Sequence, residues 1–544
     1  MLSDTTVVPD VVTAAPPADR VVLRAVAVAV GGVLTYLAFP PIGWWFAAPF
    51  GVALVFAALH GVRLRRAAWL GYLGGAAFLL PTLAWVRPIG VDAWLALVAI
   101  ESAFWAAMGV CATLTMRLRL WPLWTACLWV GQEWARGQFP VGGFPWARIA
   151  FSQGDSPLTG FAALGGAPLV SFTTVLSGSL LAYLLVQVVR ERRWRRTLAL
   201  VLAGAVALPL AGYLVPRMDD EGKSVRIGVI QGNVPGQGMT WIGDERAVVL
   251  KNHADETHRL AADVRAGRQP RPDIVVWPEN STDIDPFRDP AAFQIIDAAV
   301  KDIGVPVLVG AVVAIGDENR ATRSIVWDPV TGPGEYYDKQ KLVPFGEFTP
   351  YKDLVLALSE RAALVGRQSL AGDRPGDLVV GPVTVGAVSC YEVAFDAVVR
   401  GTVAAGGSPL VVQTNNATYE LTNLPPQQLA MSRLRAIEHN RAMVAVATTG
   451  ISAYVSPDGA LGWQSAEQVA DRTVLTVPVR TRDTLATRLG GLPELVLILV
   501  GAAAILAAVA AAHPNLRPSM RLGRRRDNTL GSGGTSAPVD ERTV

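Results

Sequence analysis

Residues 156–196 of the 544-residue chain read SPLTGFAALGGAPLVSFTTVLSGSLLAYLLVQVVRERRWRR. No Asp, Glu, Lys or Arg occurs between Ser156 and Val189, and five arginines then follow within residues 190–196. A helix needs about 20 mostly apolar residues to cross the hydrocarbon core of a bilayer. The stretch therefore predicts a membrane span, placed at residues 165–189, that ends in a positively charged loop.

Apolar segments of similar length recur on both sides of this one, and Arg24 to Arg63 enclose another run without any charged residue. Charged residues make up only 17% of the chain, against about 25% in ordinary soluble proteins. This composition excludes a purely soluble or a disordered protein, and the net charge of +3 gives no reason to expect nucleic acid as a partner. Eight spans are predicted, at residues 22–39, 43–61, 67–86, 93–116, 120–135, 165–189, 197–215 and 491–512.

Arginines cluster after every second predicted span. The loops that follow the second, fourth, sixth and eighth spans hold most of them, at residues 63–66, 117–119, 190–196 and 517–526. Because positive loops stay in the cytoplasm, both termini are predicted to be cytoplasmic and residues 217–488 to lie outside the membrane on the opposite side.

The stretch at 217–488 has short Val- and Ile-rich runs between helical patterns, which predicts an α/β domain. The predicted strands are 225–230, 274–277, 305–315, 324–327, 378–389, 410–413 and 443–448, and the clearest helices are 245–266 and 426–441. The organisation predicted for the whole chain is a polar N-terminal segment (1–21), a seven-span domain (22–216), the α/β domain (217–488), an eighth span (489–512) and a basic, then disordered, cytoplasmic tail (513–544).

Three side chains in the α/β stretch could carry chemistry. Cys390 follows a predicted strand and is the only cysteine of this domain, where an unpaired thiol is a liability in an oxidising compartment. Lys339 precedes a turn rich in Pro and Gly, and Glu279 follows Pro278 at a strand end, where α/β sites lie. Taken singly, each residue could be structural. Cys390 could be a small buried hydrophobic residue, Lys339 could lie on a solvated strand face, and Glu279 could be a carboxylate at the sheet edge.

Together, Glu279, Lys339 and Cys390 resemble the triad of the nitrilase superfamily in order and local context. The chain from about residue 22 to 512 is similar in layout to the apolipoprotein N-acyltransferase family, the membrane-integral branch of that superfamily. Matching motifs are Gly143-Phe144-Pro145-Trp146, Gln231-Gly232-Asn233-Val234-Pro235, Trp241, Trp277-Pro278-Glu279, Leu342-Val343-Pro344-Phe345-Gly346-Glu347 and Cys390-Tyr391-Glu392. One departure is Asn415-Asn416-Ala417-Thr418-Tyr419, where the family often has Asn-Asp-Ala-Trp-Phe.

The resemblance implies an α-β-β-α sandwich outside the cytoplasm of a bacterial cell and an acyl transfer through a Cys390 thioester. It implies Glu279 as general base and Lys339 as the stabiliser of the oxyanion. The acyl donor would be a membrane phospholipid, and the acceptor the α-amine of a diacylglyceryl-cysteine that begins an apolipoprotein. No cofactor or metal is implied. The positions implied to support the site or bind substrate are Glu347, Tyr391, Glu392, Trp241, Asn415 and Tyr419.

Two other functions are compatible with parts of the sequence. A membrane-tethered amidase would use the same triad with water as acceptor. A transporter with an attached domain is disfavoured, because the predicted spans hold few ionisable residues, chiefly Glu101 and Glu133, and no internal repeat. The apolar stretch 354–365 predicts an arm that dips into the membrane interface, with a buried amphipathic helix as the alternative.

Overall fold

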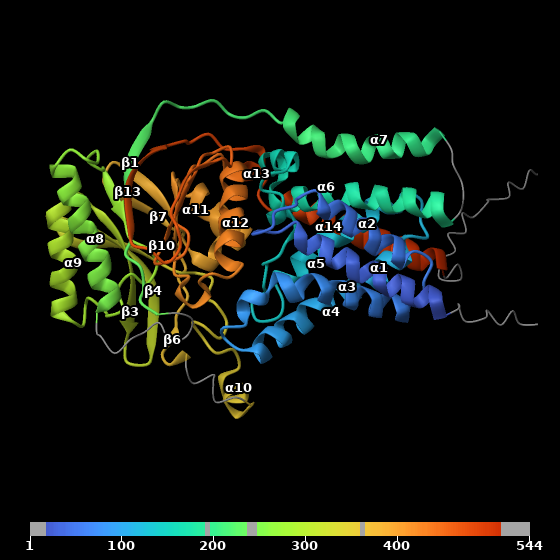
Figure 1. The fold of residues 1–544 in the computed structure, drawn as a ribbon, viewed down its shortest axis with the longest axis horizontal. Helices are drawn as coiled ribbons and strands as arrows, with labels where there is room; N and C mark the ends of the chain where they lie inside the picture. Colours follow the sequence, from blue (N-terminus) through green and yellow to red (C-terminus); the bar gives the residue numbers. More distant parts are fainter. Residues whose placement is uncertain (1–17, 191–195, 237–246, 359–364, 513–544) are drawn as a thin grey trace, which may run out of the picture.

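The computed structural model describes residues 18–190, 196–236, 247–358 and 365–512. Figure 1 shows two parts side by side along the long axis, a bundle of helices and an α/β domain. The predictions for Trp241, for most of the N-terminal segment and for the tail at 513–544 lie outside the described residues.

Every predicted apolar segment contains a helix in the structure. The bundle helices are α1 (Ala18–Leu37), α2 (Ala47–Leu59), α3 (Leu64–Thr82), α4 (Val91–Thr115), α5 (Trp121–Arg136), α6 (Ala162–Leu185), α7 (Arg196–Ala211) and α14 (Leu492–Ala512). Among the described residues, four helical stretches are long and apolar enough to cross a membrane by themselves: 20–37, 91–115, 157–188 and 492–512. With 13 residues, α2 is about 20 Å long and shorter than the span predicted there, so the count of eight spans stays a prediction.

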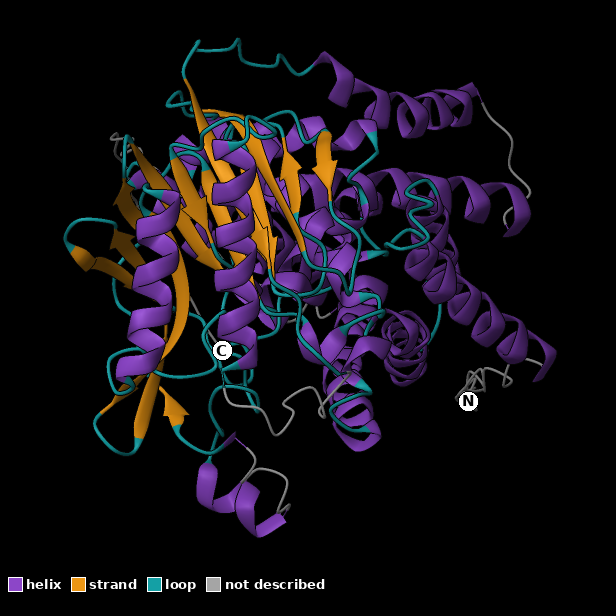
Figure 2. Cartoon of the chain, turned by 60° about the vertical axis from the view of Figure 1, so that its left-hand side comes forward, coloured by secondary structure: helices purple, strands orange, loops and turns teal. Residues whose placement is uncertain are grey.

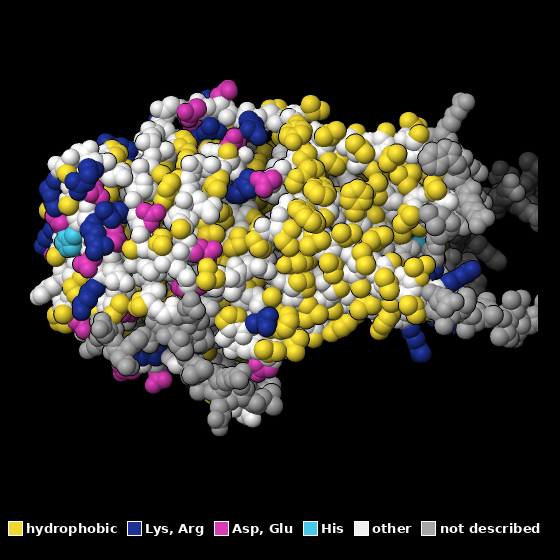
Figure 3. All heavy atoms as spheres, in the orientation of Figure 1, with side chains coloured by type: hydrophobic (Ala, Val, Ile, Leu, Met, Phe, Trp, Pro, Cys, Tyr) yellow, Lys and Arg dark blue, Asp and Glu magenta, His cyan; other side chains and the backbone are white. Residues whose placement is uncertain are grey.

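The bundle turns apolar side chains outward. Leu95 is 48% exposed, Leu499 58% and Leu506 71%, and Figure 3 shows hydrophobic side chains covering this half of the molecule, whereas charges gather on the other half. A surface of this kind is unfavourable in water and favourable in hydrocarbon. The chain is thus a membrane protein with a helical membrane domain.

The α/β domain contains two sheets. The first has the strand order β13 (Asp471–Pro478), β1 (Ser224–Gln231), β2 (Ile274–Val276), β3 (Val307–Ile315), β4 (Asn319–Asp328) and β5 (Gly332–Asp338), with β6 (Gln368–Ser369) paired to β4. The second has the order β12 (Leu461–Gln464), β11 (Ala453–Val455), β10 (Met443–Ala447), β9 (Leu410–Thr414), β8 (Val383–Ser389) and β7 (Asp377–Val380). Strands β1, β2 and β3 are parallel to one another, as are β8, β9 and β10.

The two sheets pack face to face between two helical layers (Figure 2). Val229, Val276, Val411 and Val444 belong to one buried cluster that joins the sheets. The outer face of the first sheet is covered by α8 (Val248–Arg265) and α9 (Pro290–Ile303), and that of the second by α11 (Asp396–Ala404) and α12 (Leu424–His439). The α-β-β-α arrangement is the one expected from the resemblance.

One predicted strand was wrong. The run from Leu378 to Ser389 forms two antiparallel strands, β7 and β8, rather than one. Gly381 between them has φ +56°, a left-handed conformation that glycine adopts at low cost, and Pro382 follows it. The Gly-Pro pair is a turn signal inside an otherwise continuous apolar run.

A buried network of charges joins the α/β domain to the bundle. Asp396, at the start of α11, accepts hydrogen bonds from Arg148 of the bundle and from Arg435 of α12. Arg148 also pairs with Glu494 of α14, at 3.3 Å, and Arg435 with Glu438. Burial by itself raises the pKa of Asp396, but the two guanidinium groups outweigh burial and hold that pKa below its ordinary range.

The predicted arm corresponds to α10 (Lys352–Leu358), with residues 359–364 outside the described part. In Figures 1 and 2, α10 stands apart from both sheets, below the junction with the bundle. Leu356 is half-buried and Ala357 is exposed. The described part of the segment is therefore not a helix of the domain core.

Candidate active site

The three predicted site residues follow three strand ends of the sandwich. Glu279 comes three residues after β2, Lys339 directly follows β5, and Cys390 directly follows β8. The β2 and β5 strands belong to the first sheet and β8 belongs to the second. The site therefore lies where one edge of both sheets meets, and residues more than a hundred positions apart come into contact.

Lys339 is buried between two carboxylates. Its Nζ lies 2.9 Å from Oε1 of Glu279 and 2.9 Å from Oε2 of Glu347. Burial by itself lowers the pKa of Lys339, but the two carboxylates outweigh burial and hold that pKa well above its ordinary value. The lysine is thus a fixed positive charge rather than a base.

The two oxygens of Glu279 have different surroundings. Oε1 accepts hydrogen bonds from Lys339 Nζ and, at 2.7 Å, from the Ser389 hydroxyl. Oε2 accepts one hydrogen bond from the residues that the structure describes, from the backbone N–H of Asn415 at 3.1 Å. A carboxylate oxygen has room for about two donors, so Oε2 is the oxygen with room to take a proton.

Cys390 has a left-handed backbone, with φ +46°, which is uncommon for a residue other than glycine and is often found at functional sites. The residue is partly exposed, and its sulfur accepts a hydrogen bond from Gln428 Nε2 at 3.6 Å. Burial raises the pKa of the thiol to about 12, the Glu279 carboxylate adds to this rise, and the Lys339 charge opposes it. At neutral pH the thiol is therefore protonated and needs a base to become a nucleophile.

Glu392 is a fully buried carboxylate that ties the lysine loop to the cysteine turn. Oε1 accepts the backbone N–H groups of Gln340 and Lys341, at 2.6 and 3.0 Å. Oε2 accepts the backbone N–H of Ser389 at 2.8 Å, and both oxygens accept the Tyr337 hydroxyl. Its contacts position the residues on either side of Lys339 and Cys390, and none of them reaches the triad atoms themselves.

Aromatic rings of the bundle cover the cysteine turn. Tyr391, next to Cys390, stacks on Phe144 and Trp146, with ring centroids 6.1 and 6.2 Å apart. The Tyr391 hydroxyl donates to the carbonyl of Gly143, and Trp146 Nε1 donates to Gln427 of α12. The Gly-Phe-Pro-Trp motif is thus an aromatic wall beside the thiol, contributed by the membrane domain.

The Asn415–Tyr419 segment forms another wall of the site. Besides its backbone contact with Glu279, Asn415 accepts a hydrogen bond from Thr448 through its side-chain oxygen. Tyr419 is half-buried and packs edge-on against Trp85 of the bundle, with 5.3 Å between ring centroids. The departure from the family pattern therefore falls on residues that contact the site and the bundle.

Four contributors were missed from the sequence: Ser389, Thr414, Gln428 and Trp85. Ser389 could have been predicted, because it directly precedes Cys390 and its short side chain must lie close to the same site. Gln428 lies on a helix predicted for its apolar pattern, and Thr414 ends a strand; each contacts the thiol only because the sheets and α12 pack together. Nothing in the local sequence marks these two positions.

Residues 31–180 match the family model of the apolipoprotein N-acyltransferase N-terminal domain, and residues 226–486 match the carbon-nitrogen hydrolase model. Apolipoprotein N-acyltransferase from Mycolicibacterium smegmatis is 39% identical over 527 residues, which cover 92% of this chain and 87% of the relative. The chain belongs to the apolipoprotein N-acyltransferase family. A second family member, from Gloeobacter violaceus, is 32% identical and covers 79% of this chain and 83% of its own length.

Among solved structures, an amidase from Nesterenkonia sp. is 18% identical and has a TM-score of 0.36, covering 49% of this chain and 93% of the amidase. The family assignment confirms the resemblance seen in the sequence. Because the two family models cover both the helical and the α/β parts of the chain, the assignment disfavours a transporter carrying an unrelated domain.

Proposed function

We propose that this apolipoprotein N-acyltransferase family member moves a fatty acyl chain from a membrane phospholipid to the α-amine of a lipoprotein's N-terminal diacylglyceryl-cysteine. The observation that carries the mechanism is the buried group of Glu279, Lys339 and Glu347 against the Cys390 thiol. Moving an acyl group from an ester to an amine is easier in two steps through a covalent intermediate.

In the first half-reaction, Oε2 of Glu279 takes the thiol proton as the Cys390 sulfur attacks the ester carbonyl. A new C–S bond forms, the carbonyl oxygen becomes an oxyanion, and the Lys339 ammonium stabilises it. When the C–O bond breaks, Glu279 returns the proton to the departing alkoxide, so that lysophospholipid leaves and a thioester remains. Because burial and the Glu279 carboxylate raise the pKa of the thiol, we expect the thiol to lose its proton to Glu279 as it attacks.

In the second half-reaction, the neutral amine attacks the thioester and Glu279 accepts a proton from the nitrogen. Lys339 again faces the developing oxyanion. The C–S bond breaks, the proton passes to the sulfur, and the amide product leaves with Cys390 regenerated. Glu347 supports both steps as a second carboxylate that holds the Lys339 ammonium in place, 2.9 Å from its Nζ.

The membrane domain supplies the substrates. Both are lipids, and extracting an acyl chain into water would cost about 0.8 kcal/mol for each CH₂ group. The aromatic wall of Phe144 and Trp146 belongs to the bundle and packs against Tyr391 of the active-site turn. Substrates can then reach Cys390 laterally from the bilayer, with the α/β domain on the extracytoplasmic side as the arginine pattern indicates.

The thioester is tested by incubating purified protein with phospholipid alone. The peptide that contains Cys390 should gain the mass of one acyl chain, and neutral hydroxylamine should remove it. A diacylglyceryl-cysteine peptide should then receive the chain on its amine. An acyl chain that is transferred only when both substrates are present, with no adduct on Cys390, would contradict a two-step mechanism. Release of the chain as free fatty acid instead would indicate the amidase-like use of water.

The orientation is tested with single cysteines in a chain in which Cys111, Cys127 and Cys390 are all replaced by Ser. A membrane-impermeant thiol reagent should label Asp219→Cys in intact cells, because this exposed residue lies on the α/β side of α7. The matched position, Arg119→Cys, is exposed at the opposite end of the bundle and should be labelled only after permeabilisation. The reverse labelling pattern would show that the α/β domain lies on the cytoplasmic side of the membrane.

A further inference from the structure

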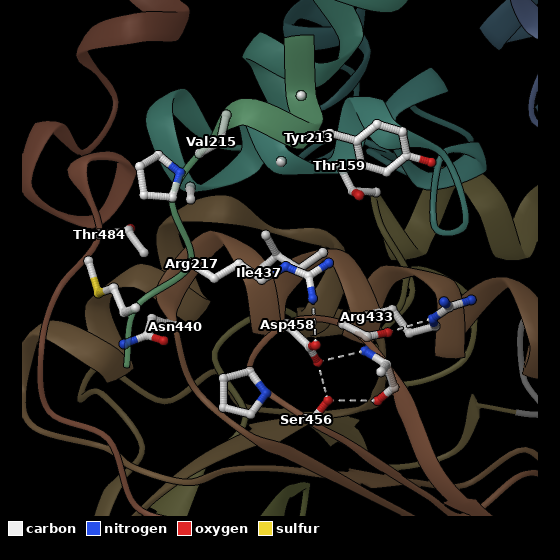
Figure 4. A pocket seen from close by; sticks show the side chains of 18 of the residues that line it. Thr159, Tyr213, Val215, Arg217, Arg433, Ile437, Asn440, Ser456, Asp458 and Thr484 are labelled. Atoms are coloured by element: carbon white, nitrogen blue, oxygen red, sulfur yellow. Dashed lines mark hydrogen bonds and ion pairs between the residues drawn. The ribbon is translucent and has the colours of Figure 1, made fainter. Parts of the chain in front are cut away.

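A cavity of about 960 Å³ lies at the junction of the bundle and the α/β domain. It is bounded by the start of α6, the link between α7 and β1, the second half of α12 and the turn after β11 (Figure 4). None of its lining residues is Glu279, Lys339 or Cys390. Gln428 faces the thiol and Ile437 lines the cavity, and these two positions of α12 are nine residues apart in sequence, which is roughly 13 Å along the helix.

The side of the cavity next to the bundle is apolar. Leu164 at the start of α6, Tyr213 and Val215 after α7, and Leu485 of α13 (Leu485–Leu489) contribute to it. Tyr213 is 70% exposed and the adjacent Leu214 is 82% exposed. Figure 4 shows Tyr213 and Val215 on the opposite side of the cavity from Asp458 and Ser456. An aromatic ring with a polar tip is typical of the boundary between hydrocarbon and head groups.

The rest of the lining, contributed by the α/β domain, by the link before β1 and by Asp155 of the bundle, is charged with both signs. The charged lining residues are three arginines and three aspartates, paired as Arg433–Asp155 (2.6 Å), Arg217–Asp458 (2.9 Å) and Arg480–Asp220 (4.0 Å). The formal charges cancel, so an ion of a single sign would leave an unbalanced charge at the cavity. A ligand with one positive and one negative group would keep the charges at the cavity balanced.

Each of these pairs has one largely exposed member. Side-chain exposure is 75% for Arg217, 66% for Asp155 and 65% for Asp220, and exposed ion pairs contribute little to stability. Nε of Arg480 is buried and donates no hydrogen bond within the described part of the chain. A phosphate oxygen would satisfy this donor with a charge-assisted hydrogen bond.

We propose that this cavity binds the head group of a zwitterionic glycerophospholipid, separately from the reaction at Cys390. The phosphate lies against the arginines, the ammonium pairs with an aspartate, and the acyl chains leave past Leu164 and Tyr213 into the bilayer. The assignment depends on the membrane placement of α6 and α7 that the proposed function includes, but it depends on none of the residues of the triad. It adds a bound lipid at the link that joins the bundle to the first strand of the α/β domain.

The test uses the Cys390→Ala full-length protein in vesicles that contain a phosphatidylethanolamine with a photoreactive diazirine near the glycerol end of its sn-2 chain. After illumination, peptide mass spectrometry should find the label within residues 154–164 and 212–220. In otherwise unchanged chains, Arg433→Gln and Arg480→Gln should each lower this labelling roughly tenfold, the loss expected for one charge-assisted hydrogen bond. The same two variants with Cys390 intact should keep their acyl-transfer rate.

Arg268→Gln is the matched control, because Arg268 is an exposed arginine paired with Asp263 on the α/β domain and outside the cavity. Its labelling should be unchanged. A diazirine analogue of phosphatidylglycerol, which lacks the ammonium, should label the two segments several-fold less, and excess soluble glycerophosphoethanolamine should not displace the lipid probe.

The proposal is overturned if the label is confined to peptides around Cys390, or if the arginine variants are labelled like the control. Equal labelling by the phosphatidylglycerol analogue would exclude a zwitterion site, and displacement by the soluble head group would indicate a site for soluble phosphates. Failure of the acyl-transfer assay in the Cys390-intact parent would count against the proposed function and leave the labelling result intact.

Discussion

The bundle and the α/β domain differ in where they place their large apolar side chains. In the bundle, large apolar side chains such as Leu95 and Leu506 face outward, and the Glu101–Arg136 pair is buried inside with 2.9 Å between its atoms. In the α/β domain, pairs such as Arg265–Asp302 lie at the surface, and apolar residues form the layers between helices and sheets. One part of the chain therefore folds in contact with lipid, and the other part folds in contact with water.

The comparison teaches what each solvent requires of packing. Lipid provides no hydrophobic force between helices, so close backbone contact has to supply the attraction. A Cβ on Gly71 would lie 2.4 Å from the carbonyl oxygen of Trp105, which shows how closely α3 and α4 approach. The α/β domain instead buries apolar side chains away from water, and it can place a lysine between two carboxylates because hydrogen bonds offset the cost of burial.

The largest expected difference between the two regions concerns their cysteines. Replacing Cys390 with Ser should lower acyl transfer at least about a thousandfold, because a hydroxyl is much harder for Glu279 to deprotonate than a thiol. Cys111→Ser in the bundle should leave the rate within about twofold, because Cys111 is only partly buried and the substitution changes its size little. The measurement is transfer to a lipopeptide in detergent. Near-normal transfer by Cys390→Ser would remove the thioester from the mechanism.

The next effect concerns the charge between the two carboxylates. Lys339→Met should lower the single-turnover acylation rate several hundredfold, as losing an oxyanion stabiliser does, with little change in phospholipid affinity. Lys341→Met is the matched control: this neighbouring ammonium lies 5.4 Å from the Phe395 ring and contacts no triad residue among the described contacts. A thermal melt of each variant separates loss of chemistry from loss of folding, because Lys339→Met also leaves two buried carboxylates without their partner. Equal losses in the two variants would exclude a specific role for Lys339.

The third effect concerns the buried charges at the junction between the bundle and the α/β domain. Arg435→Met should lower the stability of the junction by about 3 kcal/mol, because Asp396 and Glu438 lose a buried partner. The folded-state pKa of Asp396 is depressed, so its stabilising contribution is fully present above the unfolded pKa of about 3.9 and is lost progressively as the pH falls from there towards the lower folded-state pKa. The melting temperatures of wild type and variant should therefore differ most near pH 7 and converge below about pH 4. A difference that grows on acidification would contradict this assignment.

The smallest effect concerns α10. Leu356→Ser should lower transfer between lipid substrates about threefold while leaving thioester formation from a short soluble ester unchanged, if the helix contacts the membrane interface. Val330→Ser is the control, since Val330 is exposed at the turn between β4 and β5. Equal losses with lipid and soluble substrates would indicate that α10 supports the fold and not lipid access.

The sequence by itself determined the two-solvent organisation, because the apolar runs and the arginine clusters are local properties of the chain. It also determined which residues to examine, since Glu279, Lys339 and Cys390 each stand in a short motif beside a strand. It did not separate β7 from β8, and the length of α2 does not match the span predicted there. In both places the apolar run is continuous in sequence, so it did not reveal the turn between β7 and β8 or the short length of α2.

Only the tertiary structure decided how these residues work together. The fold of the segment after β5 brings Glu347 within 2.9 Å of Lys339, and the packing of the two sheets brings Gln428 to the thiol and Asn415 to Oε2 of Glu279. The same packing brings the Phe144–Trp146 wall of the bundle against Tyr391 and forms the charged cavity beside Arg433. Contacts across such separations depend on strand order and on the docking of two domains, and these are set by the burial of whole surfaces rather than by any local motif.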